Sequence, residues 1–262
     1  MTPGRPMART LSIVIPALRE ARNLAALLPA LIDQVPGAEI IVVDGGSDDG
    51  SRDVVLRAPA VRLIETGCGR ARQMNAGAAA ATGEIFLFLH ADTRLPDGAQ
   101  AGIVDALRDP GVVGGRFDVR FDNPGPTFRM IAALMNGRSR LSGISTGDQA
   151  IFVRRTTFEA LGGYPEIPLM EDVELTRRLK RVGRLAPLRL CVTTAARKWE
   201  QEGVVRTIVL MWALRFLYFC GVGPERLHRW YYGSRAPAAR RPPATPEAPA
   251  TSGTTAGGNG RA

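Results

Sequence analysis

The stretch Ile85-Phe-Leu-Phe-Leu-His90-Ala91-Asp92-Thr93 is a short apolar run that ends abruptly in a histidine and a carboxylate. A continuous apolar run of this length is typical of a central parallel strand, which is covered on both faces. Ligands of open α/β sheets bind at the carboxyl ends of such strands. The stretch therefore predicts a buried strand that delivers His90 and Asp92 to a cleft, as candidate ligands of a metal ion. The alternative is that Asp92 only caps the next turn.

Three more apolar runs precede this strand, at residues 11–15, 39–43 and 61–65, and helical patterns separate them. In the first helix the apolar residues from Leu24 to Val35 fall on one face, with Asn23 as the expected cap and Pro29 expected to kink or shorten it. Alternation of strand and helix demands parallel pairing with right-handed crossovers. The fold class predicted is α/β, a doubly wound, mostly parallel sheet with helices on both faces.

Polar side chains follow each of these strands. The second strand runs into the acidic, glycine-rich loop Asp44–Gly50, Glu65 ends the third, and Arg70 ends the turn before the alanine-rich helix expected at residues 71–81. Because the carboxyl ends of parallel strands meet at one edge of the sheet, these groups and Asp92 are expected to share one rim. That convergence favours a binding site over isolated turn and cap residues.

The second half of the chain has a different pattern. Residues 112–121 alternate between apolar and polar, which predicts an edge or antiparallel strand. A later helix opens with Glu171-Asp172, and Leu175, Leu179 and Val182 lie on the same face as Asp172. This spacing points Asp172 inward, toward the core or the cleft. The alternative is that both acids only complement the positive end of the helix.

The composition limits the kinds of ligand and macromolecule that the protein is expected to bind. The net charge is +9, and almost all of the basic residues are arginine, which suits bidentate contacts to phosphate. The charge is scattered, with no basic stretch interleaved with aromatic residues, so nucleic acid is not an expected partner. Cys68, Cys191 and Cys220 have neither disulfide nor zinc spacing, which favours a reducing compartment.

An apolar segment at residues 204–219 resembles a membrane helix, but Arg206 and Arg215 leave an uncharged run far below the roughly twenty residues of a span. The arginines fall on opposite helix faces. We expect this segment to pack on the α/β domain, to make a weak membrane-surface contact, or to form a homo-oligomer. No signal peptide is recognised before Leu11. The predicted location is cytoplasmic, peripheral at the inner membrane face.

The motifs IVIPALRE, VVDGGSDDG, FLFLHADT, STGDQAIF and GGYPEIPLMEDVELTRRLKR occur in the order and spacing of the inverting glycosyltransferases of family 2. The chain resembles that family over about residues 10 to 230. Within it, HADT, GDQ, MEDVEL and ARKWE are similar to a small bacterial subgroup assigned to arsenosugar biosynthesis. The resemblance implies a GT-A domain at 10–200, which an apolar helical segment at 201–234 follows. The composition of the two tails, 1–9 and 235–262, predicts that they are disordered.

The resemblance also implies a role for each matching residue. Asp92 would hold Mn²⁺ or Mg²⁺, with His90 at the first position of the metal motif, and Asp172 would be the general base. A nucleotide-sugar donor, with a UDP-type nucleotide favoured, would contact Pro16, Glu20, Asp44, Arg70, Arg197 and Lys198. An acceptor of unknown identity would contact Gly147, Asp148, Gln149 and Glu171.

Two other classes of function remain open from the residues alone. Gly67-x-Gly69 follows a strand, opens a helix and has Asp92 about twenty residues later, as in an NAD(P)-dependent Rossmann-type oxidoreductase. The third glycine of that fingerprint is replaced by Arg72, and two strand–helix units precede the motif instead of following it. A non-enzymatic scaffold would leave the clustered acids without a role.

Overall fold

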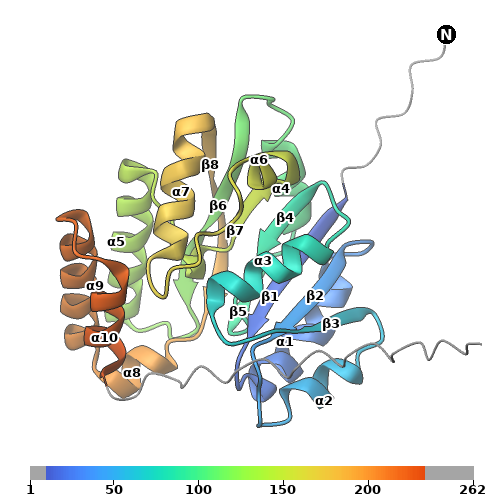
Figure 1. Ribbon diagram of the computed structural model, residues 1–262, viewed down its shortest axis with the longest axis horizontal. Helices are drawn as coiled ribbons and strands as arrows, with labels where there is room; N and C mark the ends of the chain where they lie inside the picture. Colours follow the sequence, from blue (N-terminus) through green and yellow to red (C-terminus); the bar gives the residue numbers. More distant parts are fainter. Residues whose placement is uncertain (1–9, 234–262) are drawn as a thin grey trace, which may run out of the picture.

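The computed structural model describes residues 10–233, and the two tails predicted to be disordered lie outside the described residues. Its sheet has the strand order β3-β2-β1-β4-β7-β6-β8-β5 (Figure 1). The parallel half consists of β1 (Leu11–Ala17), β2 (Glu39–Asp44), β3 (Val61–Glu65) and β4 (Ile85–Phe88). These strands correspond to the four apolar runs of the sequence, which confirms the predicted α/β fold.

The other half of the sheet is mixed. It comprises β5 (Thr93–Arg94), β6 (Val112–Phe121), β7 (Ile151–Arg154) and β8 (Arg184–Thr194). β7 runs antiparallel to both β4 and β6, whereas β6 runs parallel to β8. The predicted alternative of an antiparallel strand at residues 112–121 is confirmed by the pairing of β6 with β7. The alternative of an edge position is wrong, because β7 and β8 flank β6. β8 was missed, since its half-buried residues lack a clean alternation.

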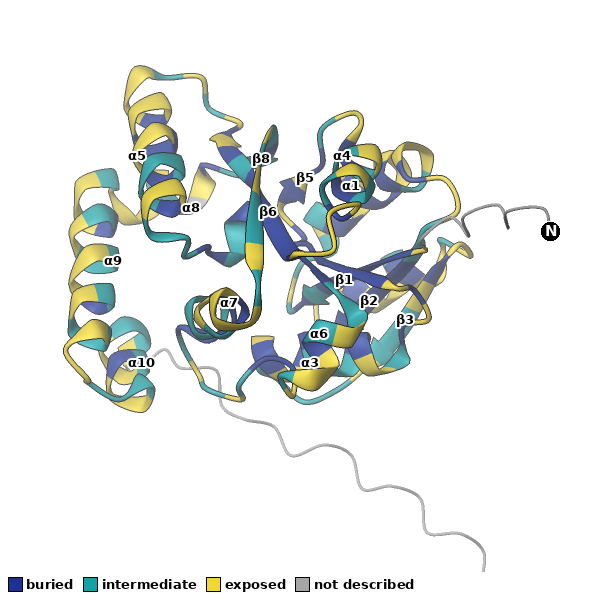
Figure 2. Cartoon of the chain, turned by 90° about the horizontal axis from the view of Figure 1, so that it is seen from above, coloured by how far each residue is buried: buried dark blue, intermediate teal, exposed yellow. Residues whose placement is uncertain are grey.

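Helices cover both faces of the sheet (Figure 2). One face packs against α1 (Ala21–Gln34), α4 (Ala99–Ala106) and α5 (Pro126–Ser142), and the opposite face against α3 (Arg70–Ala80), α6 (Arg155–Ala160) and α7 (Glu171–Val182). The short α2 (Ser51–Leu56) and the one-turn η1 (Gly147–Gln149) lie in connections. This layering places the apolar stripe of each helix on the sheet.

Helix α1 departs from the predicted local signals. It begins at Ala21, so Asn23 lies inside the helix instead of capping it, and its amide donates to Glu20 at 2.5 Å. The cap comes from the loop after β2, where Asp49 accepts the Ala21 N–H at 3.0 Å and Ser51 accepts the Glu20 N–H at 2.9 Å. Pro29 does not shorten the helix, which continues to Gln34. Tertiary contacts thus replaced a local cap.

Three helices complete the described chain, α8 (Arg197–Glu202), α9 (Val204–Phe219) and α10 (Pro224–Tyr232). Leu214 of α9 and Leu227 of α10 pack on Met170, which precedes α7, and form a small apolar cluster separate from the sheet. Within residues 10–233 no helix has the length and hydropathy needed to cross a membrane. Figure 1 shows the C-terminal helices beside the carboxyl edge of the sheet.

Candidate functional site

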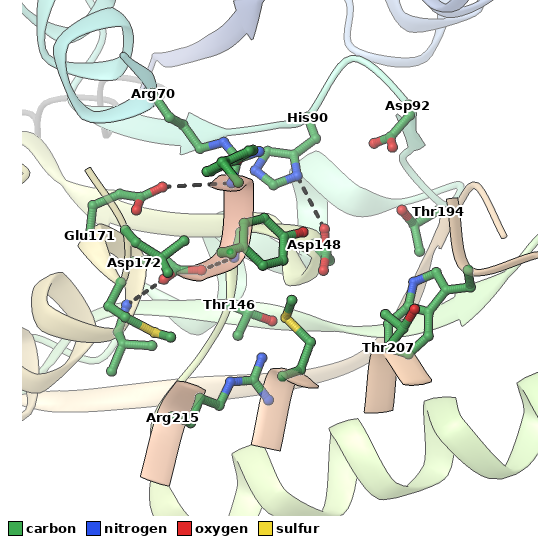
Figure 3. Close-up of a pocket in the computed structure, with 18 of the residues that line it drawn as sticks. Arg70, His90, Asp92, Thr146, Asp148, Glu171, Asp172, Thr194, Thr207 and Arg215 are labelled. Atoms are coloured by element: carbon green, nitrogen blue, oxygen red, sulfur yellow. Dashed lines mark hydrogen bonds and ion pairs between the residues drawn. The ribbon is translucent and has the colours of Figure 1, made fainter. Parts of the chain in front are cut away.

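A cleft of about 160 Å³ lies at the carboxyl edge of the parallel strands (Figure 3). Its walls come from the loop after β4, η1, the start of α7, and the C-terminal helices. The cleft gathers seven of the predicted site residues: Arg70, His90, Asp92, Gly147, Asp148, Glu171 and Asp172. Parallel topology explains the first three, because they follow β3 or β4.

His90 and Asp148 form a pair on the floor of this cleft. Nδ1 of His90 lies 3.2 Å from Oδ1 of Asp148. Nε2 of His90 is buried without a hydrogen-bond partner in the described structure and faces Gly147, where a Cβ atom would lie 2.3 Å from it. Burial opposes ionisation of Asp148, but the hydrogen bond and charge of His90, with Arg70 and Arg215, outweigh it and lower the pKa of Asp148 to about 2. Glycine is therefore required at position 147 for this packing.

Asp92 presents an exposed carboxylate at the other end of the cleft. Among the described residues, the Thr93 hydroxyl is the one group that donates to it, at 3.2 Å. Burial raises the pKa of nearby Glu20, and the charge of Asp92 raises it further against the hydrogen bond from Asn23. Among residues 10–233 no three His, Cys, Asp or Glu side chains are grouped closely enough to hold a metal ion. Asp92 thus fits a hard cation that takes its other ligands from phosphate and water, whereas His90 is engaged with Asp148.

The adjacent acids Glu171 and Asp172 open α7 but have different surroundings. Asp172 accepts the Gly147 N–H on Oδ2 and the Val173 N–H on Oδ1, both at 2.7 Å. Glu171 has a side chain only 5% exposed, with Oε1 3.7 Å from Nη1 of Arg70. Burial and the charge of Asp172 raise the pKa of Glu171, although Arg70 opposes this rise. The predicted inward stripe is correct for Leu175 and Leu179 but wrong for Val182, which is 52% exposed near the end of the helix.

Pro16, Glu20 and Asp44 lie beside the cleft, at or just after the carboxyl ends of β1 and β2, but do not line it. Asp44 is buried, and its Oδ2 accepts the N–H groups of Gly46 and Ser47 at 3.0 and 2.9 Å. Its Oδ1 is buried without a hydrogen-bond partner in the described structure. Glu20 thus lies close enough to Asp92 to feel its charge, and Asp44 offers an acceptor to which no described group donates.

The remaining predicted residues lie away from the lining of the cleft. Gln149 is fully buried, and its side-chain oxygen accepts the Thr146 N–H at 3.3 Å, so it supports the turn at η1. Arg197 is exposed on α8, and its charge lowers the pKa of Glu20 against the larger effect of burial. Lys198 belongs to the same helix, but its side chain lies outside the described structure.

The sequence interpretation missed the wall formed by the C-terminal helices. Thr207, Met211 and Arg215 of α9 reach the cleft, together with Tyr231 and Tyr232 of α10. One signal was present: Arg215 interrupts an apolar run on the face opposite to Arg206, which is exposed. Nothing in the pattern of α10 indicated where its tyrosines would lie.

Comparison with known proteins gives one family match and several relatives. Residues 12–161 match the family described as glycosyl transferase family 2. A PGL/p-HBAD biosynthesis glycosyltransferase of Mycobacterium tuberculosis is 36% identical over 168 residues, which cover 58% of this chain and 62% of that protein. The probable glycosyltransferase YdaM of Bacillus subtilis is 29% identical over 220 residues, 73% of this chain and 50% of that protein. The chain thus spans less than two thirds of the length of these relatives.

Solved structures agree on the fold. A mannosyltransferase from Pyrobaculum calidifontis, solved in complex with GDP-Man and Mn²⁺, is 23% identical with a TM-score of 0.60, covering 85% of this chain and 69% of that chain. TarS residues 1–349 from S. aureus are 17% identical with a TM-score of 0.55, covering 71% of this chain and 60% of that chain. The family match favours sugar transfer over a nicotinamide-dependent oxidoreductase.

Proposed function

The chain belongs to glycosyl transferase family 2, and from that membership we propose that it transfers a sugar from a nucleotide-sugar donor to an acceptor hydroxyl with inversion. The observation that carries the proposal is the single cleft in which Asp92 and Asp172 stand on opposite sides (Figure 3). One carboxylate is then available at the donor end and another at the acceptor end. Two carboxylates at opposite ends of one cleft suit a single displacement reaction.

The reaction needs a group that removes the proton of the acceptor hydroxyl. Asp172 takes this role because its carboxylate is partly exposed in the cleft, whereas Glu171 is buried and paired with Arg70. As Asp172 accepts the proton, the hydroxyl oxygen forms a bond to the anomeric carbon from the face opposite the diphosphate. The bond from that carbon to the diphosphate oxygen breaks, and the configuration inverts. The N–H groups of Gly147 and Val173 hold the carboxylate in place.

The departing diphosphate needs positive charge. Mn²⁺ or Mg²⁺ held by Asp92 would supply part of it as a Lewis acid. His90 would orient Asp148 and Gly147 instead of binding the ion, given its 3.2 Å contact with Asp148. Arg70 contributes a fixed charge in the cleft, and the charge of Glu171 beside it raises the pKa of the guanidinium against the opposing effect of burial. Arg197 and Lys198 are proposed as further cations at the donor end, and Gln149 as a support of the acceptor loop.

For the nucleoside we propose Pro16, Glu20 and Asp44 as contacts. The support is the buried, unpartnered Oδ1 of Asp44, an acceptor suited to an N–H or O–H group of the ligand. A UDP-type donor is the first choice, and a GDP-type donor is the alternative because the Pyrobaculum enzyme was solved with GDP-Man. Assignment to the arsenosugar subgroup stays a prediction that rests on HADT, GDQ, MEDVEL and ARKWE.

The outer face of α9 is proposed to touch a membrane surface. Val205, Val209, Trp212, Phe216 and Phe219 follow one another at helical spacing and are all more than half exposed. An exposed apolar stripe with arginine at residue 206 is typical of a helix that lies in the interface of an anionic bilayer. A cytoplasmic location at the inner membrane face belongs to the same proposal.

Nucleotide binding with and without metal tests the proposed function. Calorimetry should show binding of UDP or GDP that requires Mn²⁺ or Mg²⁺, and no binding of NAD⁺. Asp92→Ala should abolish the metal-dependent part, because it removes the carboxylate at the donor end of the cleft. Asp97→Ala, an exposed acid nearby in the sequence, is the matched control. Unchanged nucleotide binding by Asp92→Ala, insensitive to chelator, would refute the metal assignment.

A further inference from the structure

A second pocket, of about 70 Å³, lies between α5 and α9 and adjoins the cleft. Its walls are apolar and come from both helices, with Met135 and Ile131 on α5 and Ile208 and Trp212 on α9. The two cavities share Asp148 and Arg215 among their lining residues. A ligand in the cleft could therefore extend into this pocket.

Two arginines, Arg138 of α5 and Arg215 of α9, line the same pocket. In the described part of the chain neither has a carboxylate within ion-pair distance. Nε and Nη2 of Arg138 are buried without a hydrogen-bond partner, and only Nη1 approaches a carbonyl, that of Ile144, at 3.5 Å. Burial and the charge of Arg215 lower the pKa of Arg138 to about 10. Burial of a guanidinium without a counter-charge is costly, so this pocket favours the binding of an anion.

The donor diphosphate does not fit this position. Figure 3 places Arg215 beside Thr146 and Asp172, away from Asp92 at the donor end. Asp148, the carboxylate that also lines the pocket, is engaged with His90 at 3.2 Å. At the outer side of the pocket the apolar side chains of Leu134 and Trp212 are 51% and 61% exposed. The pocket thus combines an inner cationic end with an apolar exit toward solvent.

We propose that this pocket binds the acceptor, and that the acceptor is an anionic amphiphile. Its phosphate-like group lies between Arg138 and Arg215, its apolar chain leaves past Leu134 and Trp212, and its reactive hydroxyl faces Asp172. The inference rests on the proposed sugar transfer. It adds the chemical class of the acceptor and two residues that recognise it.

Binding of short model ligands tests the charge and the tail separately. Trp199 and Trp212 line the pocket, so tryptophan fluorescence reports occupancy. Octyl phosphate, below its micelle concentration, should bind at least about tenfold more tightly than either inorganic phosphate or octanol. If inorganic phosphate bound as tightly as octyl phosphate, the site would be a simple anion site. If octanol bound as tightly, it would be a simple apolar pocket. Either result would overturn the proposal.

Variants of the two arginines locate the ligand. Arg138→Met and Arg215→Met should each weaken octyl phosphate binding at least about tenfold. Methionine keeps much of the side-chain volume, and loss of an unpaired buried charge should not unfold the protein. Arg129→Met and Arg206→Met are matched controls, because each lies on the same helix as its test residue and is exposed. Unchanged binding in both test variants, with thermal unfolding as in wild type, would refute the site.

Nucleotide binding in the same variants separates the two proposals. UDP or GDP with Mn²⁺ should bind Arg138→Met and Arg215→Met as it binds wild type, and should not displace octyl phosphate. If nucleotide displaced octyl phosphate, the arginines would be donor ligands and the acceptor site would be wrong, while sugar transfer would stand. Arginine-dependent binding of octyl phosphate in a protein that bound no nucleotide would refute sugar transfer and keep the anionic site.

Discussion

At the scale of single residues, the two acids at the start of α7 differ in their accessibility from the cleft. Asp172 is held by two backbone N–H groups and stays accessible from the cleft. Glu171 is buried beside Arg70. A general base must first be able to reach its proton, and only then does its pKa matter. Geometry therefore favours Asp172, although burial and the charge of Asp172 raise the pKa of Glu171.

Asp172→Asn tests the assignment. It keeps the shape of the side chain but removes the proton acceptor, so nucleotide affinity should persist while transfer falls by roughly two to four orders of magnitude. Each variant needs a dissociation constant for the nucleotide and a single-turnover rate with acceptor. Glu171→Gln is the matched comparison and should lose less. A weakened dissociation constant with a normal rate for Asp172→Asn would place Asp172 in the binding shell instead.

The raised pKa of Glu171 predicts how the stability of the protein depends on pH. Its folded-state pKa is raised above the ordinary value of 4.5, chiefly by burial and then by Asp172. The folded state then holds the proton more tightly, so the contribution to stability is complete below pH 4.5 and is lost as pH rises through the raised value. Glu171→Gln should therefore be more stable than wild type near neutral pH, and the difference in thermal unfolding temperature should vanish in acid. A constant difference across pH would contradict this account.

At the scale of elements, α9 presents two adjoining faces, with Trp212 at their boundary because it also lines the pocket beside the cleft. One face carries Met211 and Arg215 into the cleft and the neighbouring pocket. The other carries the exposed apolar stripe that includes Trp212 and Phe216, which are 61% and 68% exposed. Because α9 is too short to cross a membrane, the stripe is suited to a shallow surface contact.

Replacing Trp212 and Phe216 together by glutamate should reduce sedimentation with anionic liposomes, because it places two charges where the apolar side chains would enter the interface. Neutral liposomes should bind the wild-type protein less well, because they carry no anionic headgroups for arginine side chains to contact. Leu56→Glu, an exposed apolar position on α2 at 68% exposure, is the control. Unchanged sedimentation with intact folding would refute membrane contact, and a change in oligomeric state alone would assign the stripe to a subunit interface.

At the scale of the whole molecule, the C-terminal helices hold the start of α7, with its two acids, in position. Met170 adopts a left-handed conformation with φ of 71° immediately before Glu171. Such a conformation is strained for a non-glycine residue and persists only when its surroundings hold it. The contacts of Met170 with Leu214 and Leu227 provide that restraint. Docking of α10 and the placement of Asp172 are therefore linked.

Leu227→Ala should loosen this docking. Leu227 is fully buried, so the truncation should cost about 2–5 kcal/mol of local or global stability. Hydrogen exchange should accelerate in α9, α10 and the start of α7 before it does in the sheet, and transfer should fall more than nucleotide affinity. Leu28→Ala, the same change in the core under the sheet, is the control and should affect the whole domain alike. Equal protection of α10 in both variants would contradict the link.

The sequence by itself determined the parallel half of the sheet and one edge of the site. Apolar runs of strand length, alternating with helical patterns, predicted β1 to β4. Arg70, His90 and Asp92, which follow β3 and β4, line one cleft because parallel strands share an end. Glu65, which was expected at the same rim, does not line the cleft and pairs with Arg52 instead. Only the tertiary structure decided the cap of α1, the inner position of β6, the pairing of His90 with Asp148 and the wall formed by α9 and α10. Periodicity records which side of an element is buried, but it does not record which distant element covers it. The position of Arg215 in the cleft and the contact of Leu227 with Met170 depend on which distant element covers each buried face.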